Sequence, residues 1–361
     1  MKLDNLMIII FCTLIVVSCK NNNIKDKSYM ANISIEECSF IDVTRCALQE
    51  NIDILGGISS INFIDDKYFV IATEKPSEIF IYNINGRQIK KIDKNGDGPY
   101  EYITPSIIRT CENKIYVWCK AQLKLIVYDI EGNGLGEHRF DRAINNFIPY
   151  NNFVSMYVIG DYRKPFIKIF DLKNSKQIHA TGIVTNEQIL LNIMYAAGGI
   201  SVFDDNIYYI SSDKLEVKSI NINTFKEESI IKIKSDPEFV VKTIKEEPAN
   251  IINNNKPAMI DYLNNNSIVS GIFTSEEYII ILSEVGVYNQ LENNRLETKR
   301  RYNKFYVLDR KSPTRVYAFK KSIETLNSLY TLHNNNLFYI KEDFSKEDMR
   351  YELREMSLEF K

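Results

Sequence analysis

The chain has 361 residues, of which 45% are hydrophobic and 25% are charged, so it can bury one large core or two ordinary ones. Its formal net charge of −2 gives no reason to expect a nucleic-acid partner. Tyrosine (22 residues) and phenylalanine (19 residues) are plentiful, which favours strands, and stretches with helical periodicity are scarce.

The N-terminus has the features of an export signal. Lys2 supplies a positive charge, and the apolar stretch Leu6–Val17 is too short to span a membrane as an ordinary helix. The ending Val16–Cys19 (VVSC) resembles a bacterial lipobox, which implies cleavage before Cys19 and lipidation of that cysteine. An ordinary cleaved signal or an uncleaved anchor is the alternative. We therefore expect a signal peptide over residues 1–18 and a polar, flexible tether over residues 19–32.

Cysteine usage does not point to a metal site. Cys12 belongs to the signal, and Cys19 is the expected lipidation site. The remaining cysteines have no zinc-type spacing, so free thiols in the core are expected although an even number outside the cytoplasm permits disulfides. These residues are Cys38, Cys46, Cys111 and Cys119.

One short pattern occurs six times: two or three polar residues followed by an apolar run rich in isoleucine and aromatic residues. A polar turn followed by such a run predicts a tight connection between two strands. The copies are IDDKYFVI (Ile64–Ile71), CENKIYVW (Cys111–Trp118), YNNFVSMYV (Tyr150–Val158), FDDNIYYI (Phe203–Ile210), TSEEYIII (Thr274–Ile281) and HNNNLFYI (His333–Ile340).

A second pattern follows each copy of the first: an apolar strand that ends in Asp or Asn and enters another polar turn. The copies are IFIYNINGR (Ile79–Arg87), LIVYDIEGN (Leu125–Asn133), IKIFDLKNS (Ile167–Ser175), VKSININTF (Val217–Phe225), KFYVLDRKS (Lys304–Ser312) and a degenerate ELREMSLEF (Glu352–Phe360). Two independent patterns in one fixed order indicate a structural repeat.

Each repeat has room for four antiparallel strands, which we name a to d from the inside outwards. Such units repeating every forty to fifty residues or so are typical of a β-propeller, in which radial closure protects the sheet edges. The sequence therefore predicts an all-β, six-bladed propeller over residues 33–361, with insertions at 235–266 and 284–302. The last repeat ends at its third strand, so we expect Ser39–Cys46 (SFIDVTRC) to supply the outer strand of blade 6 and close the ring.

The junction between repeats 1 and 2 carries a family resemblance. The stretch GDGPYEY (Gly96–Tyr102), in a six-repeat chain with a lipobox, resembles the six-bladed β-propeller family of Bacteroidota-type lipoproteins, which are relatives of NHL-type propellers. Gly96, Gly98, Pro99, Glu101 and Tyr102 match the motif. Tyr100 stands where a glycine is usual. The resemblance covers essentially the whole mature chain and implies a fold, but it carries no catalytic residues.

The same stretch begins like a calcium-binding loop. Asp93, Asn95, Asp97 and Gly98 fit positions one, three, five and six of an EF-hand. Position twelve is Thr104, where a bidentate glutamate is needed, and strands flank the loop instead of helices. We therefore interpret it as a sharp turn between blades, with calcium as the minor alternative and no other cofactor expected.

Long loops are predicted on one rim of the propeller. The d-to-a and b-to-c connections share this rim, and they include GDGPYEY, Thr185–Gly199, 235–266 and 284–302, whereas the a-to-b turns are all tight. Binding sites concentrate where loops are long, so this rim is the predicted working surface. The candidate ligand contacts are Asp97, Tyr100, Glu101, Tyr102, Tyr195, Arg300 and Arg301. An internal structural role for Glu101 and Tyr102, and a solvated charged hairpin around Arg300 and Arg301, are the alternatives.

The insertion at 235–266 contains the clearest helical pattern in the chain. Phe239, Val240 and Ile244 have near-helical spacing, which Pro248 interrupts, and a second short helix is expected to begin near Pro257. The insertion resembles a small lid or a ledge for a partner, and a plain surface excursion is the alternative.

Signals for catalysis are weak. His138, His179 and His333 have no metal-ligand spacing, and neither a nucleophile elbow nor a P-loop occurs. The pairs Asp65-Asp66 and Asp204-Asp205 suggest a glycosidase, but their repetition at equivalent turns makes them structural. Two functions remain open: a cell-envelope module that binds a glycan, peptide or protein through the loop-rich rim, and a hydrolase or lyase with its site over the central channel. The weak catalytic signal favours the binding module.

The sequence also suggests where the protein resides. Lys20 follows the lipidated cysteine where an aspartate would indicate retention at the inner membrane in some bacteria, which favours the outer membrane. The tether is basic, unlike the acidic signals associated with surface export, so the periplasmic leaflet is expected. We expect a monomer whose membrane contact is the lipid anchor.

Overall fold

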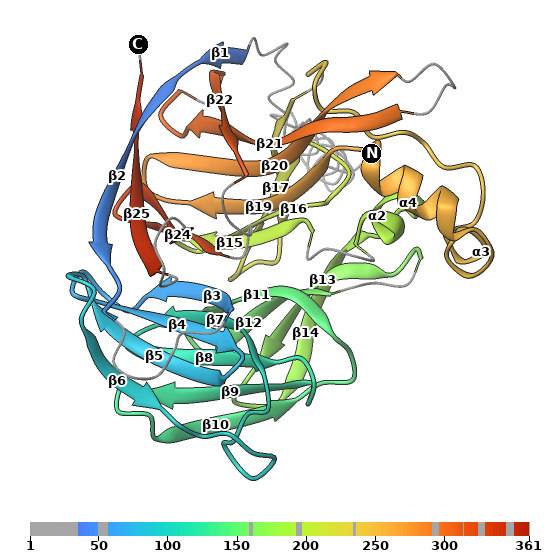
Figure 1. The fold of residues 1–361 in the computed structure, drawn as a ribbon. Coiled ribbons are helices and arrows are strands. Elements are labelled where there is room, and N and C mark those ends of the chain that lie inside the picture. The colour runs from blue at the N-terminus through green and yellow to red at the C-terminus, as the bar shows by residue number, and fades with distance from the viewer. Residues whose placement is uncertain are drawn as a thin grey trace, which may run out of the picture.

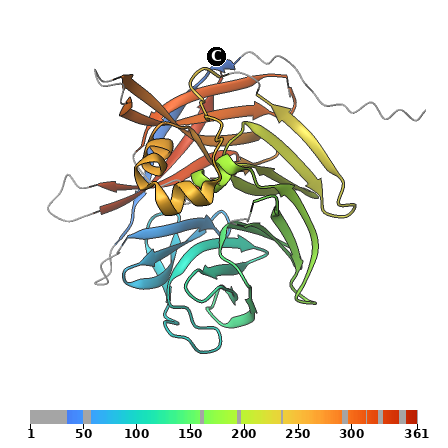
Figure 2. The same cartoon turned by 90° about the vertical axis from the view of Figure 1, so that its right-hand side faces the viewer.

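The computed structural model describes residues 35–49, 57–158, 162–192, 197–233, 236–290, 296–312, 314–323, 329–343 and 350–360, and describes no side chains at 287–300, 343 and 350. Within these residues the strands form six antiparallel sheets arranged as the blades of a propeller (Figure 1). The all-β, six-bladed architecture predicted from the sequence is therefore confirmed. A view turned by 90° shows the blades around the centre, with the helices on the near side (Figure 2).

The first three blades follow one another along the chain, each with strands a to d in sequence order. Blade 1 consists of β3 (Ile58–Phe63), β4 (Tyr68–Glu74), β5 (Ser77–Asn83) and β6 (Gln88–Ile92). Blade 2 consists of β7 (Pro105–Cys111), β8 (Lys114–Cys119), β9 (Lys124–Asp129) and β10 (Gly134–Arg139). Blade 3 consists of β11 (Ile144–Tyr150), β12 (Phe153–Val158), β13 (Pro165–Asp171) and β14 (Lys176–Ile183).

The other three blades carry the insertions and the closure. Blade 4 consists of β15 (Gly199–Phe203), β16 (Asn206–Ile210), β17 (Glu216–Asn221) and β18 (Glu227–Lys232). Blade 5 consists of β19 (Ile268–Thr274), β20 (Tyr278–Gln290), β21 (Leu296–Asp309) and β22 (Val316–Ser322). Blade 6 consists of β23 (Tyr330–His333), β24 (Asn336–Asp343), β25 (Arg350–Glu359) and the N-terminal β2 (Ser39–Ala47).

The N-terminal strand closes the ring as predicted. β2 pairs antiparallel with β25 from Ser39 opposite Glu359 to Ala47 opposite Glu352. The residues just before it form β1 (Ile35–Glu37), which pairs in parallel with β22 and adds a fifth strand to blade 5. The sequence did not predict β1. The N-terminal segment therefore joins the outer edges of blades 5 and 6, as Figure 1 shows at the blue end of the chain.

The two repeated patterns mark the two kinds of tight turn. In the a-to-b turns, polar residues such as Asn113, Asn151 and Asp204 adopt positive φ angles of 58°, 52° and 55°, which Asn and Asp tolerate better than most residues. In the c-to-d turns, the side-chain oxygen of the marked Asp or Asn accepts hydrogen bonds from N–H groups further along the turn. This holds for Asn83, Asp129, Asp171, Asn221 and Asp309.

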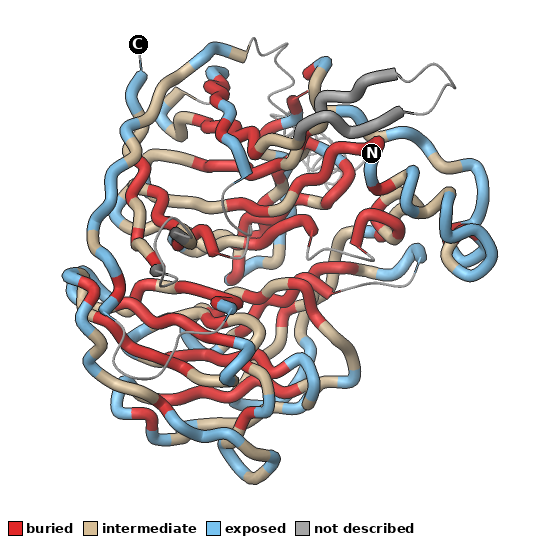
Figure 3. Tube along the Cα trace, viewed as in Figure 1, coloured by how far each residue is buried: buried red, intermediate tan, exposed pale blue. Residues whose placement is uncertain are grey.

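The hydrophobic core lies between adjacent blades. Among the described residues, each of the six junctions between blades has one cluster of buried side chains. A smaller seventh cluster, Leu191, Ala197 and Ile268, packs against Val241 and Tyr262 of the insertion. Strands b and c are buried on both faces because each lies between two neighbouring blades, which explains their continuous apolar runs (Figure 3). The outer strands are largely half-buried or exposed.

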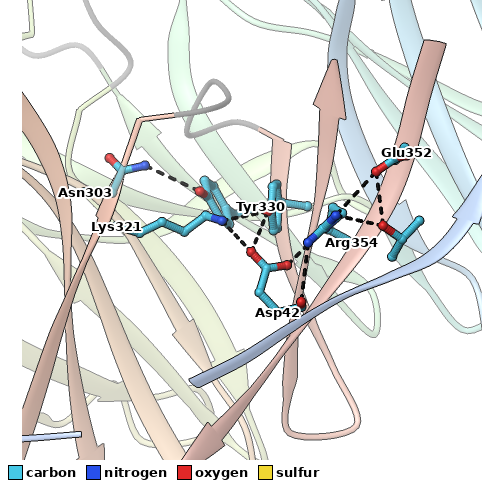
Figure 4. A network of polar contacts seen from close by, with 8 residues as sticks. Asp42, Asn303, Lys321, Tyr330, Glu352 and Arg354 are labelled. Carbon is cyan, nitrogen blue, oxygen red and sulfur yellow. Dashed lines mark hydrogen bonds and ion pairs between the residues drawn. The ribbon is translucent and has the colours of Figure 1, made fainter. Parts of the chain in front are cut away.

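A buried polar network ties the closing strand to two blades (Figure 4). The carboxylate of Asp42 on β2 accepts hydrogen bonds from Lys321 Nζ at 2.5 Å, Tyr339 OH at 2.8 Å and Arg354 Nε at 3.1 Å. Lys321 belongs to blade 5, whereas Tyr339 and Arg354 belong to blade 6. The side chains of Lys321 and Asp42 are only 7% and 16% exposed, so these charges depend on each other.

The insertion before blade 5 differs in part from the prediction. Residues 239–247 are extended or irregular instead of helical. Side chains elsewhere bind their backbone N–H groups: Ser267 Oγ accepts from Val240, and Asn266 Oδ1 accepts from Lys242. These contacts replace the bonds that a helix would form.

Two helices do follow in this insertion, α3 (Pro248–Asn254) and α4 (Lys256–Asn264). The second confirms the helix expected near Pro257, because Asn255 caps it and a proline occupies its first turn. A further helix, α2 (Asn186–Leu191), lies in the junction between blades 3 and 4. The described helices all lie on the same side of the disc (Figure 2).

The described cysteines are free thiols. Cys119 is buried, and Cys38, Cys46 and Cys111 are half-buried. Cys111 pairs with Lys114 across its hairpin and Cys119 with Pro105, so those two thiols do not face each other. Burial raises the pKa of Cys38, Cys46 and Cys119 to about 11, 11 and 12, which keeps them protonated near neutral pH. Within the described part of the chain, no helix is long and apolar enough to cross a membrane.

Candidate functional site

The long connections gather on one rim of the disc, as expected. The d-to-a segments that follow β14 and β18 carry α2, α3 and α4. The b-to-c insertion in blade 5 is an extension of the ladder between β20 and β21, which pair from Tyr278 opposite Asp309 to Gln290 opposite Leu296. We call this side of the disc the loop-rich rim.

The GDGPYEY junction is held by its own side chains. Glu101 Oε2 accepts a hydrogen bond from Gly98 N at 2.8 Å. A Cβ atom on Gly96 would lie 2.1 Å from the same oxygen, which explains the glycine there. Tyr102 is fully buried, and its hydroxyl donates to the carbonyl of Ile92. The internal interpretation of Glu101 and Tyr102 accounts for these contacts.

Tyr100 occupies a backbone conformation that explains the glycine usual at this position. Its φ is +58°, in the left-handed region. Its N–H donates to Glu137 Oε2 at 2.9 Å, its carbonyl accepts from Tyr128 OH at 2.6 Å, and its ring packs on Gly134. These contacts with blade 2 hold a non-glycine residue in place, and the ring is still 39% exposed on the surface.

Asp97 is exposed, but it already has a partner. Its Oδ1 accepts a hydrogen bond from Gln122 Nε2 at 2.8 Å. Among the described residues, no group of three or more histidine, cysteine, aspartate or glutamate side chains is arranged to hold a metal ion. The calcium-like residues Asp93 and Asn95 are exposed on the same loop.

The other rim candidates differ in what the structure shows. Tyr195 lies outside the described residues, as does the side chain of Arg300. Arg301 is 17% exposed at the base of the hairpin, with Nη2 donating to Asn266 O at 3.4 Å and Nε 3.6 Å from Glu284 Oε2. It therefore connects the hairpin to the end of the 235–266 insertion.

The start of that insertion is fixed by buried charge. Asp236 Oδ2 accepts from Lys304 Nζ at 2.5 Å and from Tyr306 OH at 2.7 Å. Glu238 Oε2 accepts from the same lysine at 2.6 Å. Burial alone would raise the pKa of Asp236, but these hydrogen bonds outweigh it and hold the pKa below its usual value. The insertion is thus anchored at both ends.

The central channel of the propeller encloses a cavity of about 590 Å³. It is lined by the innermost strands of all six blades, β3, β7, β11, β15, β19 and β23. Hydroxyl and amide side chains link neighbouring strands around it: Thr110 Oγ1 donates to Asn62 Oδ1 at 2.6 Å, and Ser201 Oγ lies 2.8 Å from Thr274 Oγ1. The lining of the channel therefore combines polar side chains with aliphatic ones such as Ile58 and Ile148.

An arginine side chain lies within the channel. Arg109 on β7 donates from Nη1 to the carbonyl of Ile108 and from Nη2 to Asn146 Oδ1, both at 2.7 Å. Among the described residues, no carboxylate lies within ion-pair distance of it. Burial lowers the pKa of Arg109 to about 10, so the guanidinium stays charged near neutral pH.

Three further polar groups that line the channel lack hydrogen-bond partners among the described residues. These are Trp118 Nε1, Asn145 Oδ1 and Asn192 Oδ1. Trp118 is fully buried, and Asn145 and Asn192 are each 6% exposed. A buried polar atom without a partner costs about 1 to 3 kcal/mol. These three atoms are covered by their surroundings, so the groups that a molecule in the channel could reach are half-buried polar side chains of the lining, such as Asn62 and Ser106.

The model of a family described as a 6-bladed β-propeller, DUF5128, matches residues 19–304. The chain belongs to the DUF5128 family. No curated protein sequence matches it. The fold of this DUF5128 protein is similar to that of a candidate exported protein of Bacteroides fragilis NCTC 9343, with a TM-score of 0.65 and 12% identity over 91% of this chain and 99% of the other. It is also similar to a member of the duf4221 family from Bacteroides vulgatus ATCC 8482, with a TM-score of 0.63 and 11% identity over 90% of this chain and 99% of the other.

The remaining motifs of this DUF5128 chain have structural roles. Asp65 Oδ1 accepts from the N–H groups of Lys67 and Tyr68 at 2.8 Å each, and Asp205 Oδ1 accepts from Tyr150 OH at 2.7 Å. His333 stacks on Phe63 with ring centroids 4.3 Å apart. The acidic pairs are therefore parts of turns, as the sequence predicted.

The channel residues of this DUF5128 protein were missed by sequence reasoning. They come from different repeats, so no local motif contains them. One signal was present: Asn62, Arg109 and Asn146 are polar residues inside innermost strands, whose other residues are mostly apolar.

Proposed function

We propose that this protein is a binding protein of the cell envelope that takes a small polar ligand through the loop-rich rim into the central channel. The observation that carries the proposal is a central cavity lined by a half-buried arginine, Arg109, which has no carboxylate partner among the described residues, and by half-buried polar side chains such as Asn62 and Ser106. The volume of about 590 Å³ lies within the range of small-molecule sites.

The lining of the channel favours binding over catalysis. Its described lining contains no histidine, cysteine or aspartate, and its two glutamates, Glu74 and Glu342, lie near the ends of strands b at the mouth. Hydroxyl, amide and guanidinium groups recognise a ligand well but are poor acids and bases near neutral pH. The hydrolase or lyase function has no specific observation in its favour.

A bulky side chain in the channel tests this proposal. Ser106 is at the loop-rich end of β7 and lines the cavity, so Ser106→Trp should block entry. Lys173 is exposed in a c-to-d turn, so Lys173→Trp is the matched control. Glycan and peptide arrays probed with the mature protein identify a ligand. We expect Ser106→Trp to abolish binding of that ligand and Lys173→Trp to leave it unchanged. Equal binding by both variants would place the site outside the channel and overturn the proposal.

We further propose that the mature protein is monomeric and held in the periplasmic leaflet of the outer membrane by a lipid on Cys19. Three observations support this proposal: the VVSC ending, a family match that begins at residue 19, and similarity to a candidate exported protein. Cys19 itself lies outside the described residues.

Metabolic labelling tests the anchor. In cells that express the full chain and are fed an alkyne fatty acid, the wild-type protein should carry the label. It should be recovered in the membrane fraction, because several acyl chains hold a protein firmly in a membrane. Cys19→Ala should abolish the label and release the protein, whereas Cys12→Ala should leave both unchanged. An unlabelled wild type would contradict the lipid anchor.

A further inference from the structure

The central channel contains a cation that the fold does not neutralise. Two of the guanidinium N–H groups of Arg109 are used, by Ile108 O and by Asn146 Oδ1. An arginine has five N–H groups, so three remain. The side chain is half-buried and lines the cavity, so the guanidinium is in part open to the channel.

Both partners of Arg109 are neutral, although carboxylates lie nearby. Glu74 and Glu342 line the same cavity, together with the exposed Lys120. Glu74 ends β4 and Lys120 directly follows β8, so these charges are at the mouth. Arg109 is the fifth of seven residues in β7, counted from the loop-rich rim, and so lies deeper. Elsewhere in this protein, buried cations such as Lys304 and Lys321 have carboxylate partners at 2.5 Å.

A charge held in this way is suited to an anion from outside. Burying a cation without a counter-ion is unfavourable, and a planar guanidinium binds a carboxylate through two parallel hydrogen bonds. The half-buried lining also offers hydroxyl and amide groups, such as those of Ser106 and Asn62. Such groups match hydroxyls or amides next to a carboxylate.

Resting on the proposed function, we propose that the channel binds a small molecule that carries a carboxylate, with the carboxylate bound by Arg109 and the neutral polar part bound by half-buried lining side chains such as Ser106 and Asn62. A uronic acid and a peptide C-terminus share this chemistry. Asn146 is a positioning residue in this site, because its side-chain oxygen holds the guanidinium from the side.

Paired probes test the proposal by calorimetric titration into the mature chain. One arm compares D-glucuronate with D-glucose, and the other compares N-acetyl-dialanine with its C-terminal amide. We expect at least one carboxylate to bind about tenfold or more tightly than its neutral partner, because the bidentate ion pair is lost in the neutral probe. The arm in which the carboxylate binds more tightly shows whether the ligand resembles a uronic acid or a peptide C-terminus.

Variants separate the role in binding from a role in folding. Asn146→Asp keeps an oxygen acceptor beside Arg109 and supplies an internal carboxylate, so it should preserve the melting temperature and abolish the preference for the charged probe. Arg109→Gln should weaken carboxylate binding by about tenfold, whereas Lys120→Gln, which removes the same charge at the mouth, should change it less than about twofold.

The outcomes distinguish this inference from the proposed function. Suppose that charged and neutral probes bind equally, and that Ser106→Trp abolishes this binding whereas Arg109→Gln does not affect it. This result would overturn carboxylate recognition by Arg109 but keep the channel as a binding site. Carboxylate binding that Ser106→Trp leaves intact would overturn both. Failure of both carboxylates to bind, or a charged preference that survives Asn146→Asp, would also overturn the inference.

Discussion

Removal of residues 1–47 is expected to prevent the propeller from folding, whereas removal of residues 1–34 should leave it intact. The longer deletion removes β2 and with it the whole ladder to β25. The shorter deletion ends just before β1 and keeps every described strand. Without β2, blade 6 has three strands and an exposed edge on β25, which invites pairing with other chains.

Size-exclusion chromatography and thermal melting monitored by circular dichroism measure this effect. The shorter deletion should elute as a monomer with an unchanged melting temperature, and the longer one should be insoluble or aggregated. A synthetic peptide of residues 35–49 added during refolding should recover monomer, because a separate strand can complete an open sheet edge. A soluble, normally melting protein without residues 1–47 would show that the ring does not need its N-terminal strand.

Asp42→Ala is expected to lower the free energy of unfolding by about 3 kcal/mol, because it removes a carboxylate that accepts hydrogen bonds from a buried lysine and a half-buried arginine. Lys321 and Arg354 are 7% and 19% exposed. Asp141→Ala removes a carboxylate that is 81% exposed and should have little effect. Denaturant unfolding of the two variants beside the wild type measures the difference, and equal losses would contradict the role assigned to Asp42.

The loss of stability caused by Asp42→Ala should depend on pH. Burial alone would raise the pKa of Asp42, but the hydrogen bonds from Lys321, Tyr339 and Arg354 outweigh it and hold the pKa below its usual value. The pKa of Asp42 is about 4 in the unfolded chain and lower in the folded protein. Asp42 therefore stabilises the folded state fully at a pH above about 4. This stabilisation is lost as the pH falls from about 4 through the lower pKa of the folded protein. The gap between wild type and Asp42→Ala should therefore be constant from about pH 5 to 7 and narrow below about pH 4. A gap that widens with acid would contradict this assignment.

Much of the fold could be predicted because its turns are chemically specific. Asn83, Asp171 and Asn221 mark equivalent turns, since a short side-chain oxygen can bind the N–H groups of its own turn. The closing strand could be placed by counting, since a sixth unit with three strands needs a fourth.

The helical insertion and the channel could not be predicted as well. Residues 239–247 have helical spacing, but side chains such as Asn266 and Glu187, distant in sequence, bind their N–H groups at 2.6 and 2.9 Å. The channel brings together Arg109 of blade 2 and Asn146 of blade 3, which are 37 residues apart, so only the closed ring creates their contact. The rim candidates Glu101 and Tyr102 mark the junction between blades 1 and 2 and not a ligand site, because their side chains form hydrogen bonds with the backbone of Gly98 and Ile92 in that region.

The pairing of β2 with β25 also constrains when this protein can finish folding. Arg354 and Asp42 are 312 residues apart in sequence. β2, near the start of the propeller, must therefore wait for β25, the last of the described strands. Since contacts this distant form slowly, blades 1 to 5 can assemble during synthesis, but the circle cannot be completed until β25 has been made.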